Sequence, residues 1–130
     1  MQKAASGSPA PFLSEARSTD LKYEIKARIV RTLANPRRLE IVDILRRGER
    51  SVTEISKAVG LTQAGTSQHL AVLRLRGIVE VRRRGNFTYY RLADPAIGRA
   101  CAMMNDAVVA VLSREQDVVR PILAAARGGR

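Results

Sequence analysis

The stretch LTQAGTSQHLAVLRLRGIVEVRRRGNFTYYRL, residues 61–92, decides the fold because its hydrophobic pattern changes period midway. Over residues 63–76 the leucines recur at helical spacing, which predicts a helix. Two β-rich runs follow over residues 78–92, on either side of Gly85-Asn86. A glycine-containing dipeptide between two such runs favours a tight hairpin turn. We therefore predict a helix followed at once by an arginine-rich β-hairpin.

The segment upstream begins with two predicted helices. In residues 21–33 apolar side chains recur at every fourth position, which produces one apolar helical face. Asn35-Pro36 then supplies an N-cap and a first-turn proline for a helix over about residues 37–47. We expect Gly48 to end this helix as a left-handed C-cap.

A short third helix forms a helix-turn-helix with the helix that follows it. Ser51 and Glu54 have the spacing of a capping box, and Gly60 is placed to end the helix. Thr62 can then cap the helix over residues 63–76. Two helices joined by a short glycine-containing turn are typical of a helix-turn-helix. The core residues expected from these patterns are Leu39, Ile41, Val42, Leu45, Ile55, Val59, Leu70 and Leu73, with Val72 or Leu75.

The composition indicates a polyanionic partner. The 130 residues include 23 Lys and Arg against 12 Asp and Glu, a net charge of +11, and the forked donors of arginine suit phosphates and base edges. Double-stranded DNA is favoured over an anionic membrane surface, because no basic amphipathic helix carries a bulky aromatic face. No apolar run approaches the ~18 residues of a membrane span. With one cysteine and no export signal, we expect a cytoplasmic protein.

These patterns predict one domain, mainly α with a small β-hairpin: a winged helix-turn-helix that dimerises through its terminal helices. Asp94-Pro95 opens a last helix that we expect to run toward Val119 and stop before Pro121. We divide the chain into a disordered N-terminal arm (1–19), the winged helix-turn-helix domain for DNA binding and dimerisation (20–120) and a flexible tail (121–130).

Residues 61–92 closely resemble the corresponding part of the ArsR/SmtB (arsenic-repressor-like) winged helix-turn-helix transcription regulators. The motifs NPRRLEI, SQHL, GIVEVRRRG and YYRL carry the resemblance in this order, and it extends over roughly residues 21–119. The resemblance implies a homodimer that binds an operator palindrome in double-stranded DNA and represses until an inducer lowers its affinity. The sequence does not identify that inducer.

The first two turns of the helix over residues 63–76 are polar or small, as a recognition helix that reads base edges requires. Gln68 can make paired hydrogen bonds to adenine, while Ala64 and Gly65 let the backbone approach the DNA. The arginines of the hairpin suit phosphate or minor-groove contact, and a solvated hairpin is the alternative. The residues expected at the DNA are Thr62, Gln63, Ala64, Thr66, Ser67, Gln68 and His69, with Arg82, Arg83 and Arg84 of the wing.

His69 is the only histidine of the chain, so its role narrows the function. A metal site needs further ligands nearby, and a catalytic site needs a nucleophile or an acid–base partner; the sequence offers neither. The resemblance places His69 on the recognition helix, where we expect DNA contact or support of the helix surface, with core packing as the alternative. We expect no enzymatic activity.

An apolar stripe along the last predicted helix indicates a dimer interface. A small winged helix cannot cover so long a stripe by itself, so we expect a partner helix there; the alternative is that this helix folds back over its own core. The first helix is expected to share the interface. The interface residues predicted are Leu21, Ile25, Ile97, Cys101, Met104, Val108 and Val111.

The sequence departs from the best-known members of the resembled family at the sensor. It lacks the cysteine pairs and the histidines that bind metals in those members, so we expect no metal site and no cofactor. Cys101 stands alone, and packing as a small hydrophobe is favoured over the alternative of a redox sensor formed by the thiols of two subunits. The alternative function is a protein–protein interaction module that uses the winged helix without specific DNA binding.

Overall fold

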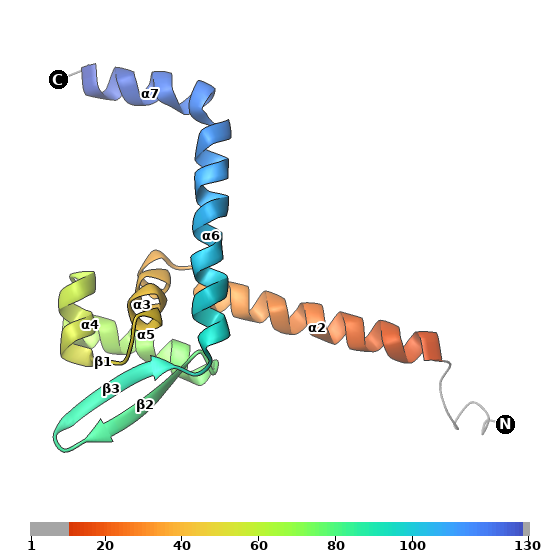
Figure 1. The fold of residues 1–130 in the computed structure, drawn as a ribbon, viewed down its shortest axis with the longest axis vertical. Coiled ribbons are helices and arrows are strands. Elements are labelled where there is room, and N and C mark those ends of the chain that lie inside the picture. The colour runs from red at the N-terminus through yellow and green to blue at the C-terminus, as the bar shows by residue number, and fades with distance from the viewer. Residues whose placement is uncertain (1–10, 129–130) are drawn as a thin grey trace.

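The computed structural model describes residues 11–128 (Figure 1). In chain order the elements are α2 (Pro11–Leu33), α3 (Pro36–Arg46), β1 (Arg50–Ser51), α4 (Val52–Val59), α5 (Gln63–Leu75), β2 (Val79–Arg84), β3 (Phe87–Leu92), α6 (Pro95–Arg114) and α7 (Gln116–Gly128). Helices α4 and α5 form the helix-turn-helix, and β2 and β3 form the wing. The predicted fold class, mainly α with a small β-hairpin, is therefore confirmed.

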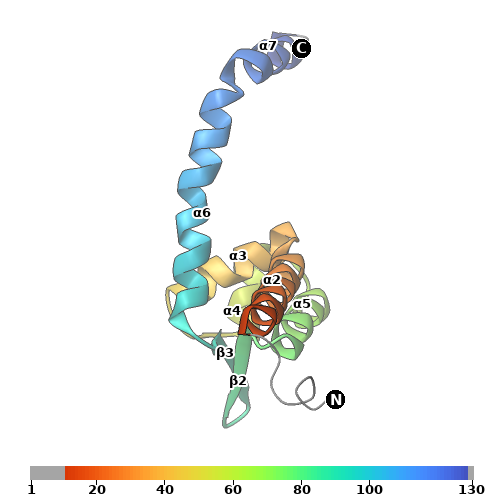
Figure 2. The ribbon, with the colours of Figure 1, turned by 90° about the vertical axis from the view of Figure 1, so that its right-hand side faces the viewer.

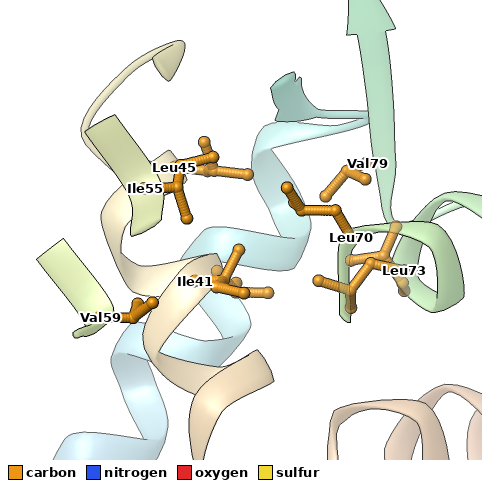
Figure 3. Packing of buried hydrophobic residues seen from close by; sticks show 9 residues of the cluster. Ile41, Leu45, Ile55, Val59, Leu70, Leu73 and Val79 are labelled. Carbon is orange, nitrogen blue, oxygen red and sulfur yellow. The ribbon is translucent and has the colours of Figure 1, made fainter. Parts of the chain in front are cut away.

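The core lies between α3, α4, α5 and the start of β2 (Figure 3). Its buried apolar residues are Ile41, Val42, Leu45, Ile55, Val59, Leu70, Leu73, Ile78 and Val79. Full burial of an aliphatic side chain of this size stabilises the fold by about 1.5–3 kcal/mol. One core expectation fails, since Leu39 is 38% exposed; of the alternatives Val72 and Leu75, Val72 is half-buried whereas Leu75 is 79% exposed. Leu39 and Leu75 both lie off the helix face that carries the buried residues of their helix.

The wing belongs to a three-stranded antiparallel sheet with the order β1-β3-β2. Arg84 pairs with Phe87 at the tip, around a turn in which Gly85 has φ +60°, a left-handed conformation that glycine adopts without steric cost. The sequence does not predict β1, because two residues are too few to show a period. Its pairing with β3, with Ser51 opposite Tyr89, depends on contact between distant segments.

Side chains cap the helices at the predicted starts. The side chain of Asn35 accepts hydrogen bonds from two backbone amides in the first turn of α3. Ser51 and Glu54 form the predicted capping box at α4. The backbone amide of Ser51 and, to a lesser extent, its hydroxyl hold the pKa of the Glu54 carboxyl below its ordinary value. Thr62 accepts from the amide of Gly65 and so caps α5.

One of the two predicted glycine caps differs in the structure. Gly60 ends α4 in the left-handed conformation, with φ +71°. At the end of α3, however, the cap is Arg47 in a right-handed helical conformation, and Gly48 follows with φ +140°. The chain therefore leaves α3 one residue earlier than expected, and Gly48 follows the cap with a positive φ that favours glycine.

The terminal helices differ from the sequence predictions at both ends of the chain. α2 begins at Pro11, so residues 11–19, expected in a disordered arm, are helical; residues 1–10 of that arm lie outside the described residues. α6 ends at Arg114, with Glu115 as its C-cap, and so stops short of the expected end near Val119. α7 (Gln116–Gly128) then continues through Pro121, where we expected the helix to have stopped, into the expected tail. Pro121 is the sixth residue of α7, so its missing amide hydrogen removes one intrahelical hydrogen bond from this helix. The division of the chain into arm, domain and tail stays a prediction.

α2 and α6 leave the core in different directions and carry exposed apolar side chains (Figures 1 and 2). The first turns of α6 pack on α3, while its second half extends away from the core (Figure 2). By length and composition α6 is also long and apolar enough to cross a membrane. By this measure the expectation that no apolar run approaches a membrane span is not met, although α6 carries Arg99 and Asp106.

Candidate nucleic-acid interface

Helix α5 presents a row of small and polar side chains on the side away from the core. Ala64, Ser67 and Gln68 are exposed in its first turns, whereas Leu70 and Leu73 anchor the opposite side. The buried side fixes the rotation of the helix about its own axis, so the exposed row keeps one direction. The structure therefore leaves these three predicted DNA-contacting residues accessible to a partner.

Thr62 and Gln63, also predicted at the DNA, are exposed but already make hydrogen bonds within the protein. The Thr62 hydroxyl oxygen accepts from the Gly65 amide at 3.0 Å as the N-cap. The Gln63 amide nitrogen donates to the Thr53 hydroxyl at 3.0 Å and so links α5 to α4. The Thr62 contact fixes the start of α5, while the Gln63 contact joins the two helices of the helix-turn-helix. The hydroxyl hydrogen of Thr62 and the amide oxygen of Gln63 stay available to DNA.

The predicted DNA contact of Thr66 is wrong, because its side chain is completely buried. Thr66 lies one turn before Leu70 on the core-facing side of α5. Its hydroxyl donates to the Thr62 carbonyl at 2.9 Å, which satisfies the polar group inside the protein. Threonine here packs as an apolar residue of valine size.

His69 is half-buried and faces the start of α3 instead of standing free on the surface. Its Nδ1 accepts a long hydrogen bond of 3.4 Å from Nε of Arg38. A guanidinium only donates, so Nδ1 is the acceptor in this contact and Nε2 is the ring nitrogen left for another partner. The contact joins α5 to α3, and both roles expected for His69, DNA contact and support of the helix surface, stay predictions.

The wing arginines divide between the two faces of the hairpin. Arg82 and Arg84 lie on one face of β2 and both pair with Glu49, with closest distances of 3.3 and 2.9 Å. Arg84 also lies over the ring of Tyr89, 5.3 Å from its centroid. Arg83 lies on the opposite face, and in the described part of the chain no carboxylate comes within ion-pair distance of it. Arg83 is therefore the wing arginine with the least competition for a phosphate.

Sequence reasoning missed Glu49, which lies between α3 and β1. Its side chain is only 22% exposed, and Oε1 accepts hydrogen bonds from both wing arginines. Oε2 is buried and receives no hydrogen bond, although Nε of Arg82 lies 3.3 Å away. The partners of Glu49 are 33 and 35 positions away in sequence, so only the pairing of β1 with β3 could have revealed them.

The predicted dimer residues fall into two groups. Leu21, Ile25, Met104, Val108 and Val111 are exposed, each between 40% and 57%. Ile97 and Cys101 instead pack against the core of their own chain. The alternative that α6 covers its own core is therefore correct for its first turns, and the expected stripe is available to a partner only beyond Cys101.

Cys101 is a partly buried thiol with weak acidity. Burial raises the pKa of the Cys101 thiol above its ordinary value, and the negative charge of Asp43 raises it further. Within the described residues, no three histidine, cysteine, aspartate or glutamate side chains gather closely enough to hold a metal ion. Neither observation supplies a soft-metal or thiolate centre in the part of one chain that the structure describes.

The similarity of this chain to known proteins covers the helix-turn-helix and the start of the wing. The model of the arsR family of bacterial regulatory proteins matches residues 35–81, from the N-cap of α3 into β2. Rv0081 of Mycobacterium tuberculosis, an uncharacterized HTH-type transcriptional regulator, is 39% identical over 103 residues, which are 78% of this chain and 90% of that protein. The crystal structure of Rv0081 matches with a TM-score of 0.65 and 40% identity, covering 71% of this chain and 93% of the other.

Two further solved structures have known or named roles. The homodimeric winged helix-turn-helix DNA-binding domain of Mb0332 from Mycobacterium bovis is 38% identical, with a TM-score of 0.64 over 75% of this chain and 88% of that one. The transcriptional repressor BigR from Xylella fastidiosa is 33% identical, with a TM-score of 0.65 over 71% and 94%. These matches share the helix-turn-helix and the wing, and the chain belongs to the ArsR family of bacterial regulatory proteins.

Proposed function

We propose that this chain is a cytoplasmic, homodimeric repressor that binds an inverted-repeat operator. The observation that carries the proposal is the exposed row of Ala64, Ser67 and Gln68 on a helix whose rotation the core fixes. The repressor BigR and the homodimeric DNA-binding domain of Mb0332, both similar to this chain, support it.

The row on α5 suits a major groove. Ala64 and Ser67 are small enough to let the helix backbone approach the base edges. Gln68 can pair with the N6 and N7 atoms of adenine, and a good bidentate contact discriminates by about 1–3 kcal/mol. The wing then contacts the neighbouring backbone, with Arg83 offering a guanidinium free of carboxylates on its own face of the hairpin.

A partner subunit is the occupant that best fits the exposed apolar side chains of α2 and α6. Met104, Val108 and Val111 are each more than half exposed and recur at helical spacing, which favours helix-to-helix packing. A bilayer fits less well, because a charge such as Asp106 at the centre of a spanning helix costs about 2.5–3.5 kcal/mol. Two copies joined in this way would present two recognition helices to two half-sites.

Selection of bound duplexes from random DNA tests the proposal. The expected result is an inverted repeat with half-site centres about 34 Å apart, bound by one dimer. Anisotropy titrations should show affinity that falls steeply with KCl, and a scrambled duplex should bind far more weakly. Equal affinity for all duplexes at physiological salt would contradict the proposal and favour the protein–protein interaction module.

The oligomeric state is tested by placing a charge on the apolar stripe. Val108→Glu should convert the dimer to a monomer and weaken operator binding, because a carboxylate would be buried without a partner. Asn105→Glu is the matched control: it adds the same charge to the same helix at a polar position. Sedimentation equilibrium measures both. A dimer that tolerates Val108→Glu as well as Asn105→Glu would exclude this interface.

A further inference from the structure

Four arginines from three helices converge where α2, α3 and α5 meet. Arg28 and Arg31 come from the last turns of α2, Arg38 from the first turn of α3, and Arg76 follows α5 as its C-cap. Together they line two adjoining depressions of about 250 and 270 Å³, which share Arg28, Thr32 and Arg76. Neither depression is lined by an acidic residue. Figure 2 shows α2 beside α5, the arrangement that brings the arginines together.

The four arginines contrast with the arginines of this structure that form ion pairs. Six others, Arg37, Arg46, Arg47, Arg82, Arg84 and Arg91, each pair with a carboxylate. Across the described ranges no carboxylate lies within 4.0 Å of the four clustered guanidinium groups. Glu24, one turn before Arg28, lines a third depression together with Arg28 and Arg31 but forms no ion pair with either. Like charges held together in this way repel unless an anion joins them.

Arg38 is fixed in place by hydrogen bonds that leave part of its fork unused. Its Nη1 donates to the Thr32 carbonyl at 2.9 Å, and its Nε donates to Nδ1 of His69 at 3.4 Å. The Thr32 side chain is itself buried, and its hydroxyl donates to the Arg28 carbonyl. The cluster therefore contacts the recognition helix through His69, and the Arg38 guanidinium is already ordered in the absence of a ligand.

We infer that this cluster, Arg28, Arg31, Arg38 and Arg76, binds a phosphate group. Planar guanidinium groups donate pairs of hydrogen bonds that match phosphate oxygens, and several of them can share one tetrahedral anion. The phosphate belongs either to the DNA backbone beside the recognition helix, which rests on the proposed function, or to a small phosphate-bearing effector. The binding chemistry is the same in both cases.

Glutamine substitutions test the site, because they remove the charge and keep most of the aliphatic chain. Arg28→Gln and Arg76→Gln are compared with Arg114→Gln, an exposed arginine at the far end of α6. If DNA supplies the phosphate, each cluster variant should bind every duplex about five- to tenfold less tightly at 0.1 M KCl and lower the salt slope by about one. Arg114→Gln should behave as wild type.

A calorimetric titration with pyrophosphate, in buffer free of other phosphates, tests the second source. An effector site predicts saturable binding to wild type and to Arg114→Gln that both cluster variants lose, with unchanged DNA affinity in the absence of pyrophosphate. The inference is overturned if the cluster variants match Arg114→Gln in both assays. If wild type selects no operator, the proposed function fails, while non-specific DNA binding and the pyrophosphate titration still decide the arginine site.

Discussion

Glu49→Gln should increase the affinity of the protein for DNA, because Glu49 competes with phosphates for two wing arginines. Its carboxylate lies 2.9 Å from Arg84 and 3.3 Å from Arg82. Glutamine keeps the shape and one acceptor oxygen but removes the negative charge. Both arginines then meet DNA without first breaking an ion pair.

The magnitude follows from the exposure of the pairs. The arginine side chains are 57% and 46% exposed, so solvent screens both interactions. Exposed ion pairs contribute about 0.2–1 kcal/mol each, and two of them give about 0.4–2 kcal/mol. At about 1.4 kcal/mol per factor of ten, the gain is roughly two- to thirtyfold in affinity. The salt slope should become steeper by up to about two, since two more cations can release counterions.

Anisotropy titrations across a KCl series measure both quantities. Glu80→Gln is the matched control, because Glu80 lies on β2 and pairs at 3.1 Å with Arg91, away from the hairpin tip. It changes the net charge by the same amount without releasing Arg82 or Arg84. An equal gain from Glu80→Gln would reduce the effect to net charge. A loss of affinity in Glu49→Gln would refute competition and show instead that Glu49 orients the wing.

Three further predictions use separate assays. Gln68→Ala should lose about 1–3 kcal/mol of discrimination at one base step, whereas Arg83→Ala should weaken binding to all duplexes alike. Competition binding with single-base operator variants measures the discrimination of each variant, and identical results for the two would contradict this division of roles. Cys101→Ser should leave operator affinity unchanged with and without a mild oxidant, because burial raises the thiol pKa, so a loss confined to oxidised wild type would identify a sensor. The lowered pKa of Glu54 stabilises the fold above the ordinary glutamate pKa, and this contribution disappears as pH falls through the lowered value. Unfolding curves of wild type and Glu54→Gln should therefore differ at neutral pH and converge in acid, and a constant difference would contradict this.

Local chemistry explains which parts of the fold are predictable from the sequence. The N-caps Asn35 and Ser51 and the left-handed Gly60 act on backbone groups two to four residues away, so their signals are complete within a short window. The hairpin is equally local, with its turn at Gly85 between two β-rich runs. These features needed no knowledge of the tertiary structure.

The candidate interface was predictable only in part, because the polarity of a residue does not show whether its side chain faces the core or the solvent. Thr66 looks like a surface residue beside Ser67, yet a carbonyl four residues earlier satisfies its hydroxyl and lets it face the core. Glu49 and Arg38 affect the interface through contacts more than 30 positions away in sequence. No local sequence pattern predicts such contacts, although they determine which arginine side chains remain unpaired and available to DNA.

The apolar stripe of α6 shows how one periodic pattern can serve two surfaces. Gly98, on its first turns, lets α6 approach α3 so closely that an added Cβ would lie 2.9 Å from atoms of Arg46 and Leu92. This close approach directs Ile97 and Cys101 onto the core of the same chain. Beyond that contact the helix continues past the domain, and the same spacing leaves its later apolar residues uncovered. Periodicity therefore predicts which side of the helix is apolar, while the length of the domain beneath it determines where intramolecular packing ends and the need for a partner begins.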